Sequence, residues 1–283
     1  YGGQEDIERR VIRAVGEPGR RFKEDALRML RAVRFACRLD FAIEPATARA
    51  LAERAPLLDV VARERVGVEL SGILVTARAG EALVRYPELM CAALPELRRC
   101  RGFDQRSVYH DSDDYGHLAR VVSAVCHLTP SPSLAVVWAA LLHDVAKPDC
   151  FSIDGEGRGH FYGHPEASER MARGIFRRLS ISGDIAREAC LLIRYHDMSI
   201  GTSREDILHT LNLLSRGGGD ALARMDALID IKCADAMGKV HACRCCLEEY
   251  AAVRAHAHDL VDAGEAFNMK TLDLSGGDLI CAG

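Results

Sequence analysis

The sequence lacks a long hydrophobic run. Hydrophobic residues make up 48% of its 283 positions, yet no apolar stretch reaches the roughly 18 residues that a membrane-spanning helix needs. The first residues also lack a signal-peptide pattern, and the chain opens at Tyr1 rather than at a methionine. We therefore expect no membrane association and a cytoplasmic location, and we expect the chain to be a piece of a longer protein.

The cysteines lack the arrangement of a zinc ribbon. Although there are eleven of them, they do not form two paired C-x-x-C motifs. Their one cluster consists of Cys243, Cys245 and Cys246, with His241 just before it. This cluster has two readings: reduced thiols on a helix of a cytosolic protein, or a second metal site.

The net charge of −4 lacks a strong bias of either sign, but it is unevenly distributed. Residues 1–101 contain 19 basic and 15 acidic side chains, whereas the remainder contains 18 and 26. A basic N-terminal segment favours a polyanionic partner, and an acidic remainder more readily attracts cations.

Helical periodicity dominates the sequence, which predicts a mainly α fold. Apolar stripes of helical spacing run from Phe22 to Leu39, and helices are also expected at Pro45–Arg54 and Val60–Arg78. Val11–Val15 reads as a short strand before a turn at residues 16–19. With no partner nearby, this strand suggests the last piece of a sheet that is otherwise missing.

Four arginines follow one flank of the first long helix. They are spaced by three, three and four residues, at Arg28, Arg31, Arg34 and Arg38, so their guanidinium groups lie on one side. Such a flank is either a solvated charged face or a surface for phosphate groups.

The most informative stretch is Leu134–Val145, which is almost uninterrupted in apolar residues. It predicts a helix buried on nearly all sides that ends before Pro148. His143 and Asp144 lie near its end, where a carboxylate is costly unless it is paired or bound to a metal. Helix neighbours differ by about 100° in direction, so both side chains can converge on one ion. Lys147 follows one turn later, where it could hold a phosphate.

Four more candidate ligands lie near the ends of other expected helices. His117 comes as a helix begins, His164 opens another, His196 follows the helix Ile185–Tyr195, and Asp235 lies late in a further helix. A single histidine at a helix end is usually structural. Several of them on successive helices around one His-Asp pair favour a metal site.

In this order, His117, His143-Asp144 and Asp235 resemble the pattern of the HD superfamily of metal-dependent phosphohydrolases. The resemblance implies an all-α HD domain that hydrolyses nucleotide or RNA phosphate esters. It also implies His164 and His196 as ligands of a second metal, and Asp144 and Lys147 as catalytic residues. Mixed imidazole and carboxylate ligands suit transition metals better than calcium. We expect one or two divalent ions, which leaves Mn, Ni, Co, Fe, Zn and Mg as candidates.

Residues 20–35 resemble the neck of the class II tRNA nucleotidyltransferase (CCA-adding) and poly(A) polymerase family, and Arg63-Glu64-Arg65 resembles a later motif of that neck. In this family a Glu-Asp-x-x-Arg motif reads the incoming base. The resemblance therefore implies nucleotide binding by Glu24, Asp25 and Arg28, and a role of the arginine flank in binding RNA. The implied partners are tRNA or other RNA 3′ ends, with ATP and CTP in the intact protein. The residues implied to bind RNA are Arg31, Arg34 and Arg38.

The resemblance extends to both ends of the chain. Residues 2–7 and 12–16 resemble the end of the family's catalytic head, and residues 272–279 resemble the start of its tail. The implied division is a remnant of the head at 1–20, a helical neck at 21–100, an HD domain at 101–240 and a truncated helical tail at 241–283. The head's Gly-Ser and Asp-x-Asp motifs do not precede the neck, so this chain is not expected to add nucleotides.

Three functions stay open on the sequence alone. The HD domain is a phosphohydrolase, or it is an architectural part of an RNA- and nucleotide-binding body, or it is a regulatory module that binds a nucleotide without turnover. The choice between CCA and poly(A) addition in the parent protein, the metal and the oligomeric state also stay open.

Overall fold

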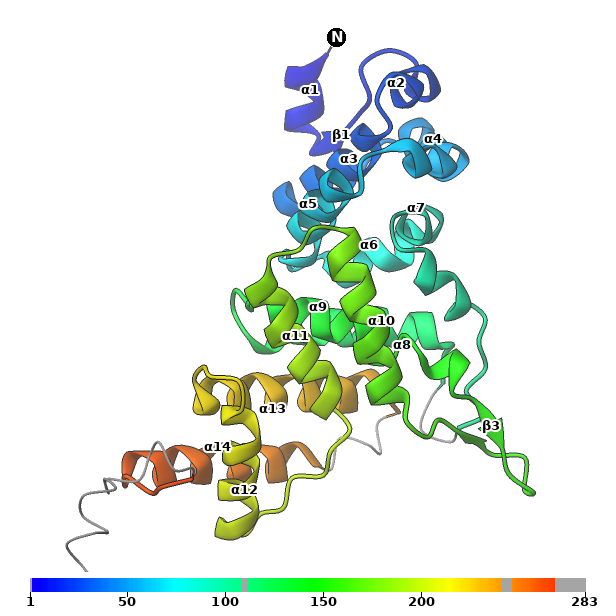
Figure 1. Ribbon diagram of the computed structural model, residues 1–283. Coiled ribbons are helices and arrows are strands. Elements are labelled where there is room, and N and C mark those ends of the chain that lie inside the picture. The colour runs from blue at the N-terminus through cyan, green and yellow to red at the C-terminus, as the bar shows by residue number, and fades with distance from the viewer. Residues whose placement is uncertain (1, 108–110, 241–245, 268–283) are drawn as a thin grey trace, which may run out of the picture.

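The computed structural model describes residues 2–107, 111–240 and 246–267, and these residues are mainly helical, as the sequence predicts. Figure 1 shows an elongated arrangement, with α1–α7 at one end, α8–α11 in the middle and α12–α14 at the other end. The elements are α1 (Gly3–Glu8), β1 (Val11–Ile12), α2 (Pro18–Glu24), α3 (Leu27–Leu39), β2 (Ala42–Ile43), α4 (Pro45–Arg54), η1 (Ala55–Val60), α5 (Arg63–Leu74), α6 (Ala79–Arg85), α7 (Pro87–Ala93), η2 (Pro95–Arg99), α8 (Asp114–Leu128), α9 (Leu134–Leu142), η3 (Lys147–Asp149), β3 (Ser152–Ile153), β4 (Gly159–His160), α10 (His164–Arg178), α11 (Gly183–Tyr195), α12 (Arg204–Ser215), α13 (Ala221–Gly238) and α14 (Leu247–Asp262).

The expected first strand has a partner, so the prediction of an unpaired strand was wrong. β1 pairs in parallel with β2, and Val11 lies opposite Ala42. Between them the chain makes α2 and α3, and then turns at Asp40, whose φ of 55° is left-handed. The connection therefore brings together two segments about 30 residues apart, which local periodicity could not reveal.

The helix expected from Phe22 to Leu39 is interrupted. Glu17 caps α2 by accepting hydrogen bonds from the amides of Gly19 and Arg20, and that helix ends at Glu24. Asp25 is extended, with φ −154° and ψ 103°, before α3 begins at Leu27. The helix expected at Val60–Arg78 is also shorter, because α5 ends at Leu74. The apolar periodicity correctly predicted helices in both regions, but it did not predict where those helices are interrupted.

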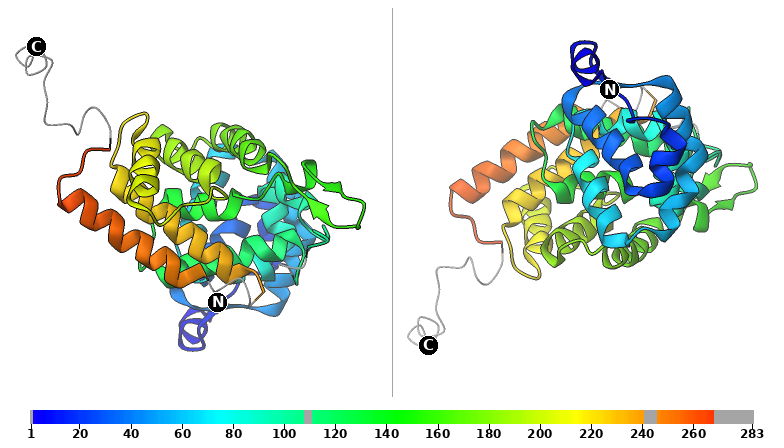
Figure 2. Two further views of the ribbon diagram at one scale, coloured as in Figure 1. Left: turned by 90° about the horizontal axis from the view of Figure 1, so that it is seen from below. Right: turned by 90° about the horizontal axis from the view of Figure 1, so that it is seen from above.

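Helix α9 is the centre of the core. Every residue from Ala135 to Leu142 is buried, and α8, α10, α11, α13 and α5 all pack against it. The views along the long axis in Figure 2 show the surrounding helices on several sides. Trp138 links α5, at one end of the molecule, to α10 in the middle, because its indole Nε1 donates to Ser71 Oγ of α5 at 3.3 Å and its ring meets Phe176 of α10 edge-on at 5.6 Å.

The segment at residues 99–107, which connects η2 to α8, is partly built into the core. Cys100 and Gln105 are buried, at 0% and 1% exposure. The carbonyl oxygen of Arg106 in this segment accepts a hydrogen bond from the amide of Gly159 at 3.1 Å, in the short antiparallel hairpin of β3 and β4, where Ser152 lies opposite His160.

The structure bears on the predicted tail motif, the cysteine cluster and the absence of a membrane-spanning helix only within the described residues. The tail motif at residues 272–279 and the cluster of Cys243 and Cys245 with His241 lie outside the described residues. Across the described part of the chain, no helix combines the length and the apolar character needed to cross a bilayer.

Candidate metal centre

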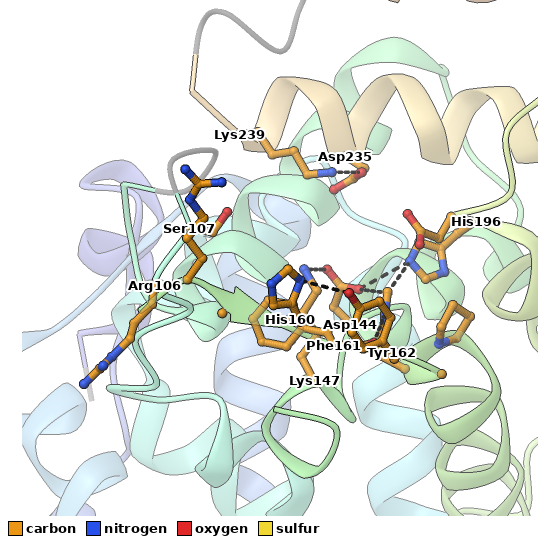
Figure 3. A pocket seen from close by; sticks show the side chains of 16 residues that line it. Arg106, Ser107, Asp144, Lys147, His160, Phe161, Tyr162, His196, Asp235 and Lys239 are labelled. Carbon is orange, nitrogen blue, oxygen red and sulfur yellow. Dashed lines mark hydrogen bonds and ion pairs between the residues drawn. The ribbon is translucent and has the colours of Figure 1, made fainter. Parts of the chain in front are cut away.

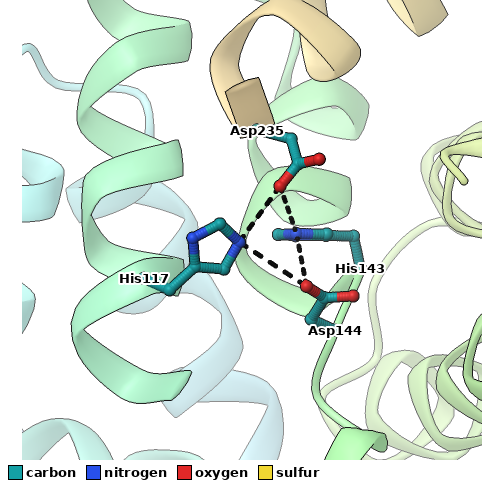
Figure 4. A group of neighbouring side chains, drawn as sticks. All are labelled: His117, His143, Asp144 and Asp235. Atoms are coloured by element: carbon teal, nitrogen blue, oxygen red, sulfur yellow. Dashed lines mark ion pairs between the residues drawn. The ribbon is translucent and has the colours of Figure 1, made fainter. Parts of the chain in front are cut away.

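The six ligand candidates of the HD pattern come from five separate helices and meet at one place. His117 lies in the first turn of α8, and Asp235 lies in the last turn of α13. The remaining four follow α9, begin α10 or end α11: His143, Asp144, His164 and His196. They form two groups that could each hold a metal ion, and Asp144 belongs to both. Figure 4 shows the first group, with the side chains of His117, His143, Asp144 and Asp235 converging.

The backbone fixes the orientation of three imidazoles. The Nδ1 atoms of His143, His164 and His196 lie 2.9, 2.8 and 2.8 Å from the carbonyl oxygens of the residues three positions earlier. Because a carbonyl oxygen only accepts, each Nδ1 carries the hydrogen. In the neutral ring, the Nε2 lone pair therefore points into the centre. This is the arrangement in which a protein holds a metal-binding imidazole.

Asp144 divides its two oxygens between the two groups. Its Oδ2 lies 3.1 Å from Nε2 of His143 and 3.5 Å from Nε2 of His117. Its Oδ1 lies 3.1 Å from Nε2 of His164 and 3.3 Å from Nε2 of His196. Imidazole lone pairs that face carboxylate oxygens repel one another unless a cation or a proton lies between them. The buried donor set therefore fits divalent ions, and its mixture of nitrogen and oxygen fits a transition metal.

Asp235 completes the first group. Its Oδ1 lies 3.1 Å from Nε2 of His117 and 3.8 Å from Nε2 of His143. Neither this oxygen nor Oδ1 of Asp144 has a hydrogen-bond partner among the described residues. A buried acceptor without a partner is costly, and a cation in each of the two groups would satisfy the oxygen that faces it.

The charges of this centre perturb its titratable groups in the absence of an ion. Burial opposes protonation of His143, but the carboxylates of Asp144 and Asp235 outweigh it and raise the pKa of His143 to about 10. Burial also opposes ionisation of Asp144, while His143 and Lys147 hold the pKa of this carboxyl well below its usual range. A dense set of opposite charges in a buried place is typical of a functional site.

Lys147 reaches the centre from a different element than expected. Helix α9 ends at Leu142, so Lys147 does not continue a helical face from His143, but instead lies on the short helix η3. Its Nζ lies 2.6 Å from Oδ2 of Asp144, and it donates to Oε1 of Gln105 at 3.1 Å. The expected proximity to Asp144 is present, but a turn rather than a helix provides it.

A cavity of about 750 Å³ opens beside the centre. Figure 3 shows Asp144, Lys147, His196 and Asp235 around it, with the residues of the β3–β4 hairpin close by. Positive side chains are frequent in its lining: Arg106, Lys147, Arg158 and Lys239. Cations next to a metal-ligand cluster suit an anionic substrate such as a phosphate ester.

Several residues of this site were missed by the sequence analysis. Nζ of Lys239 lies 2.6 Å from Oδ2 of Asp235, which is four residues earlier on the chain. The helical i, i+4 spacing of these two residues was a signal in the sequence that could have identified Lys239. Asp114 and Gln105 are buried near the centre. Only their position in the fold brings them there, since neither belongs to a periodic pattern.

The Glu-Asp-x-x-Arg motif lies about the break between α2 and α3. Oε2 of Glu24 accepts hydrogen bonds from Arg21 at 2.5 Å and from Arg28 at 3.0 Å, and the bond from Arg28 lowers the pKa of Glu24. Asp25 instead accepts from the amide of Leu27 at 3.1 Å. Glu24 and Arg28 are therefore paired with each other, whereas Asp25 shapes the break.

A second cavity, of about 310 Å³, adjoins this motif. Arg13, Arg21, Arg28 and Arg31 all line it, together with the half-exposed ring of Phe35. A cationic cavity with an aromatic wall can accept a nucleotide.

The arginine flank is less uniform than its spacing suggests. Nε of Arg34 donates to Oε2 of Glu69 at 2.6 Å, and its guanidinium lies over the ring of Phe35 at 4.6 Å. Arg31 and Arg38 are exposed. The structure therefore gives Arg34 a role in joining α3 to α5, and leaves Arg31 and Arg38 accessible.

Comparison with known proteins identifies two segments. Residues 114–242 match the family model described as the HD domain, and residues 40–98 match the model of a probable RNA and SrmB-binding site of polymerase A. The order of the two segments is that expected from the sequence.

Curated relatives match over a large part of this chain. It is 34% identical over 203 residues to an A-adding tRNA nucleotidyltransferase of Deinococcus radiodurans, covering 69% of this chain and 46% of the relative. It is 35% identical over 224 residues to a multifunctional CCA protein of Ralstonia nicotianae, covering 76% and 50%. The chain thus spans about half the length of these curated relatives.

Solved structures share the fold. The CCA-adding enzyme of Bacillus stearothermophilus in complex with CTP superposes with a TM-score of 0.63 at 24% identity, covering 99% of this chain and 57% of the other. A Thermotoga maritima CCA-adding enzyme complexed with tRNA gives a TM-score of 0.56 at 17% identity, covering 100% and 58%. The chain therefore carries an HD domain after a polymerase A-type RNA-binding segment, and it is homologous to the CCA-adding tRNA nucleotidyltransferases over their C-terminal part.

Proposed function

We propose that the HD domain of this chain is a divalent-metal-dependent phosphohydrolase that acts on phosphate esters of nucleotides or RNA. The observation that carries the proposal is the position of Asp144, whose two oxygens each face a different pair of histidines. A carboxylate shared between two ligand groups is suited to two neighbouring ions. The proposed ligands are His117, His143, Asp144 and Asp235 for one ion, and Asp144, His164 and His196 for the other.

Divalent ions in such a site supply Lewis acidity, which makes water a better nucleophile and offsets the negative charge of phosphoryl oxygens. The side chains of this chain supply the rest. Lys147, buried against Asp144, is placed to stabilise negative charge as the ester bond breaks. Lys239 adds a second cation on the other side of the cavity, next to Asp235.

The proposed residues also hold the site in place without a substrate. The three carbonyl contacts fix the imidazole rings. Lys232 is buried and donates to the backbone oxygen of His196 at 2.8 Å, which holds the end of α11 where its histidine faces Asp144. A centre fixed in this way needs little rearrangement when a substrate binds.

A first test measures metal content and hydrolysis together. The purified protein should carry a divalent transition metal and hydrolyse bis-p-nitrophenyl phosphate. A chelator should abolish that activity, and added metal should restore it. His143→Ala should lose both the metal and the activity, whereas the exposed His127→Ala should keep both. Full activity in His143→Ala would remove the phosphohydrolase proposal.

The neck favours a second function, which is binding of RNA and a nucleotide. The supporting observation is the cationic cavity lined by Arg13, Arg21, Arg28 and Arg31. Relatives named as tRNA nucleotidyltransferases, and a similar structure that contains tRNA, make tRNA 3′ ends the proposed partner. ATP and CTP are the proposed nucleotides of the intact protein. In that intact protein, Asp25→Ala should disturb the choice of base while hydrolysis of bis-p-nitrophenyl phosphate continues.

The proposed domain division follows from these roles. Residues 1–20 would belong to a preceding catalytic head, residues 21–100 to the RNA- and nucleotide-binding neck, and residues 101–240 to the HD domain. The boundary at residue 20 falls within α2, and the boundary at residue 100 falls at the buried Cys100, so the proposed division marks roles along the chain rather than separately folded units. Should the HD domain bind metal without turnover, the architectural or regulatory reading would replace the hydrolytic one.

A further inference from the structure

The β3–β4 hairpin carries two stacked rings beside the metal centre. The rings of His160 and Tyr162 are nearly parallel, at 4°, with their centroids 5.3 Å apart. Both residues line the cavity that also contains Asp144 and Lys147, and Figure 3 shows them in that lining. Tyr162 is 79% exposed. The pair thus leaves a large part of an aromatic ring open to solvent at the edge of a charged cavity.

Hydrogen bonds fix the orientation of this pair. Oδ2 of Asp154 accepts from Nε2 of His160 at 2.8 Å, so Nδ1 of that ring is left as an acceptor. The hydroxyl of Tyr162 lies 3.3 Å from this Nδ1. The other oxygen of Asp154 accepts from the amides of Glu156 and Arg158, each at 2.9 Å, and closes the hairpin turn. Both rings are therefore held before any ligand binds.

The base of the hairpin is anchored next to Lys147. Phe161, between the two stacked residues, packs instead against Phe103 and Phe151, with centroids 6.2 and 5.7 Å apart. Nζ of Lys147 lies 5.3 Å from the Phe161 ring. At Gly159, a Cβ atom would lie 2.2 Å from the backbone oxygen of Gln105, so only glycine allows this close approach. These contacts fix the stacked pair relative to the metal centre.

The surroundings of the pair suit a nucleotide. Arg106 and Arg158 line the same cavity, and cations beside an exposed aromatic ring are a common arrangement for binding single-stranded nucleic acid. The cavity volume of about 750 Å³ falls in the range of about 300–1,000 Å³ that is typical of sites for whole small molecules. A phosphate group alone would leave most of this space unfilled.

We propose that Tyr162, supported by His160, is a stacking platform for the nucleobase next to the phosphate that the metal centre holds. The platform makes this site select phosphate esters of nucleosides over phosphate esters that carry no base. The placement of the phosphate depends on the function proposed above, whereas the stacking itself does not depend on turnover. A free nucleotide and the end of an RNA strand present the same chemistry here.

Binding measurements test the platform without requiring hydrolysis. Isothermal titration of the metal-free and the metal-loaded protein would compare adenosine 5′-phosphate with ribose 5-phosphate, which lacks the base. Stacking of one base contributes about 5- to 150-fold in affinity. Tyr162→Ala should therefore reduce the affinity ratio between the two ligands by about this factor. Tyr162→Phe, which keeps the ring, should retain most of the ratio.

A matched control and a kinetic assay complete the test. Ile153→Ala changes an exposed apolar residue of the same hairpin that does not line the cavity, and it should keep the wild-type ratio. In the kinetic assay, Tyr162→Ala should lower kcat/KM for adenosine 2′,3′-cyclic phosphate relative to the cyclic phosphate of methyl riboside. The same nucleotide at the end of a short oligoribonucleotide would show whether a free nucleotide or an RNA end is preferred.

The outcomes separate this inference from the proposed function. Equal weakening of both ligands in Tyr162→Ala, or a wild-type protein that binds the two equally, would overturn the platform. A wild-type protein that hydrolyses no ester, yet prefers the nucleotide through Tyr162, would retain the platform and remove the phosphohydrolase.

Discussion

The Nε2 atoms of His164 and His196 lie 3.3 Å apart, although both rings use their Nδ1 hydrogens for backbone carbonyls. Two lone pairs at this distance require a proton or a cation between them and the adjacent Oδ1 of Asp144. Together with Asp144, these two histidines form the second of the two ligand groups, and they face Oδ1 of Asp144 whereas His117 faces Oδ2.

The first prediction concerns the number of metal ions. Because the two groups share only Asp144, His164→Ala and His196→Ala should each reduce the content from two ions to one. Asp144→Ala should remove both. Metal analysis of desalted protein measures this, and His127→Ala serves as the control. Two ions retained in His164→Ala would contradict the assignment of the second group.

The second prediction concerns Lys147, whose Nζ lies 2.6 Å from Oδ2 of Asp144. Replacing it by methionine keeps the length and removes the charge. We expect kcat to fall by about 10²- to 10³-fold, by analogy with the loss of one group that stabilises the transition state, while the bound metal remains. Arginine at this position should restore part of the rate. An unchanged kcat in Lys147→Met would show that this lysine only balances the charge of Asp144.

The third prediction concerns pH and Asp114, a fully buried residue of the first turn of α8. Burial, together with the charge of Asp144, raises the pKa of this carboxyl to about 6 in the absence of metal. Because the pKa of Asp114 in the folded protein exceeds the ordinary value of 3.8, the neutral carboxyl that the fold favours contributes fully to the free energy of unfolding below about pH 4. This contribution is lost as the pH rises through about 6.

Asp114→Asn should therefore raise the free energy of unfolding of the metal-free protein at pH 7. A shift of about two pKa units corresponds to at most about 3 kcal/mol. At pH 4 the variant and the wild type should be similar. Urea unfolding in the presence of a chelator at both pH values measures this, with Asp59→Asn on the surface as control. A gain of the same size at both pH values would exclude titration of Asp114 as the cause.

The fourth prediction separates structure from RNA binding along α3. The Arg34–Glu69 ion pair is only partly exposed, at 20% and 10% for the two side chains. Glu69→Ala would leave the guanidinium without this partner, and we expect a loss of about 1.5–3 kcal/mol in unfolding free energy. Thermal or urea unfolding would show it, and a change below about 0.5 kcal/mol would contradict it.

For the exposed arginines the expected effect is on binding. Arg31→Ala and Arg38→Ala should weaken the binding of tRNA, and each phosphate that the protein no longer neutralises should reduce the slope of log K against log salt by about one. Their stability should change by less than about 0.5 kcal/mol. Fluorescence anisotropy over a range of salt concentrations measures this. If neither the affinity for tRNA nor the salt slope changes in either variant, these two residues form only a solvated charged face.

The sequence alone was sufficient for features that depend on local physics. The apolar run Leu134–Leu142 predicts a buried helix because no surface orientation could solvate it. His164 and His196 were expected at the ends of helices, where α10 begins and α11 ends. The ordered histidines and aspartates then carried the resemblance to the HD pattern, which the match over residues 114–242 confirms.

Only the tertiary structure decided how these parts meet. The pairing of β1 with β2 and the burial of Gln105 depend on contacts between distant segments, which a local period does not contain. The two oxygens of Asp144 face different histidine pairs because α8, α10 and α11 approach the turn after α9 from different sides. The ligand types are therefore a property of the sequence, whereas their division into two groups is a property of the helix packing.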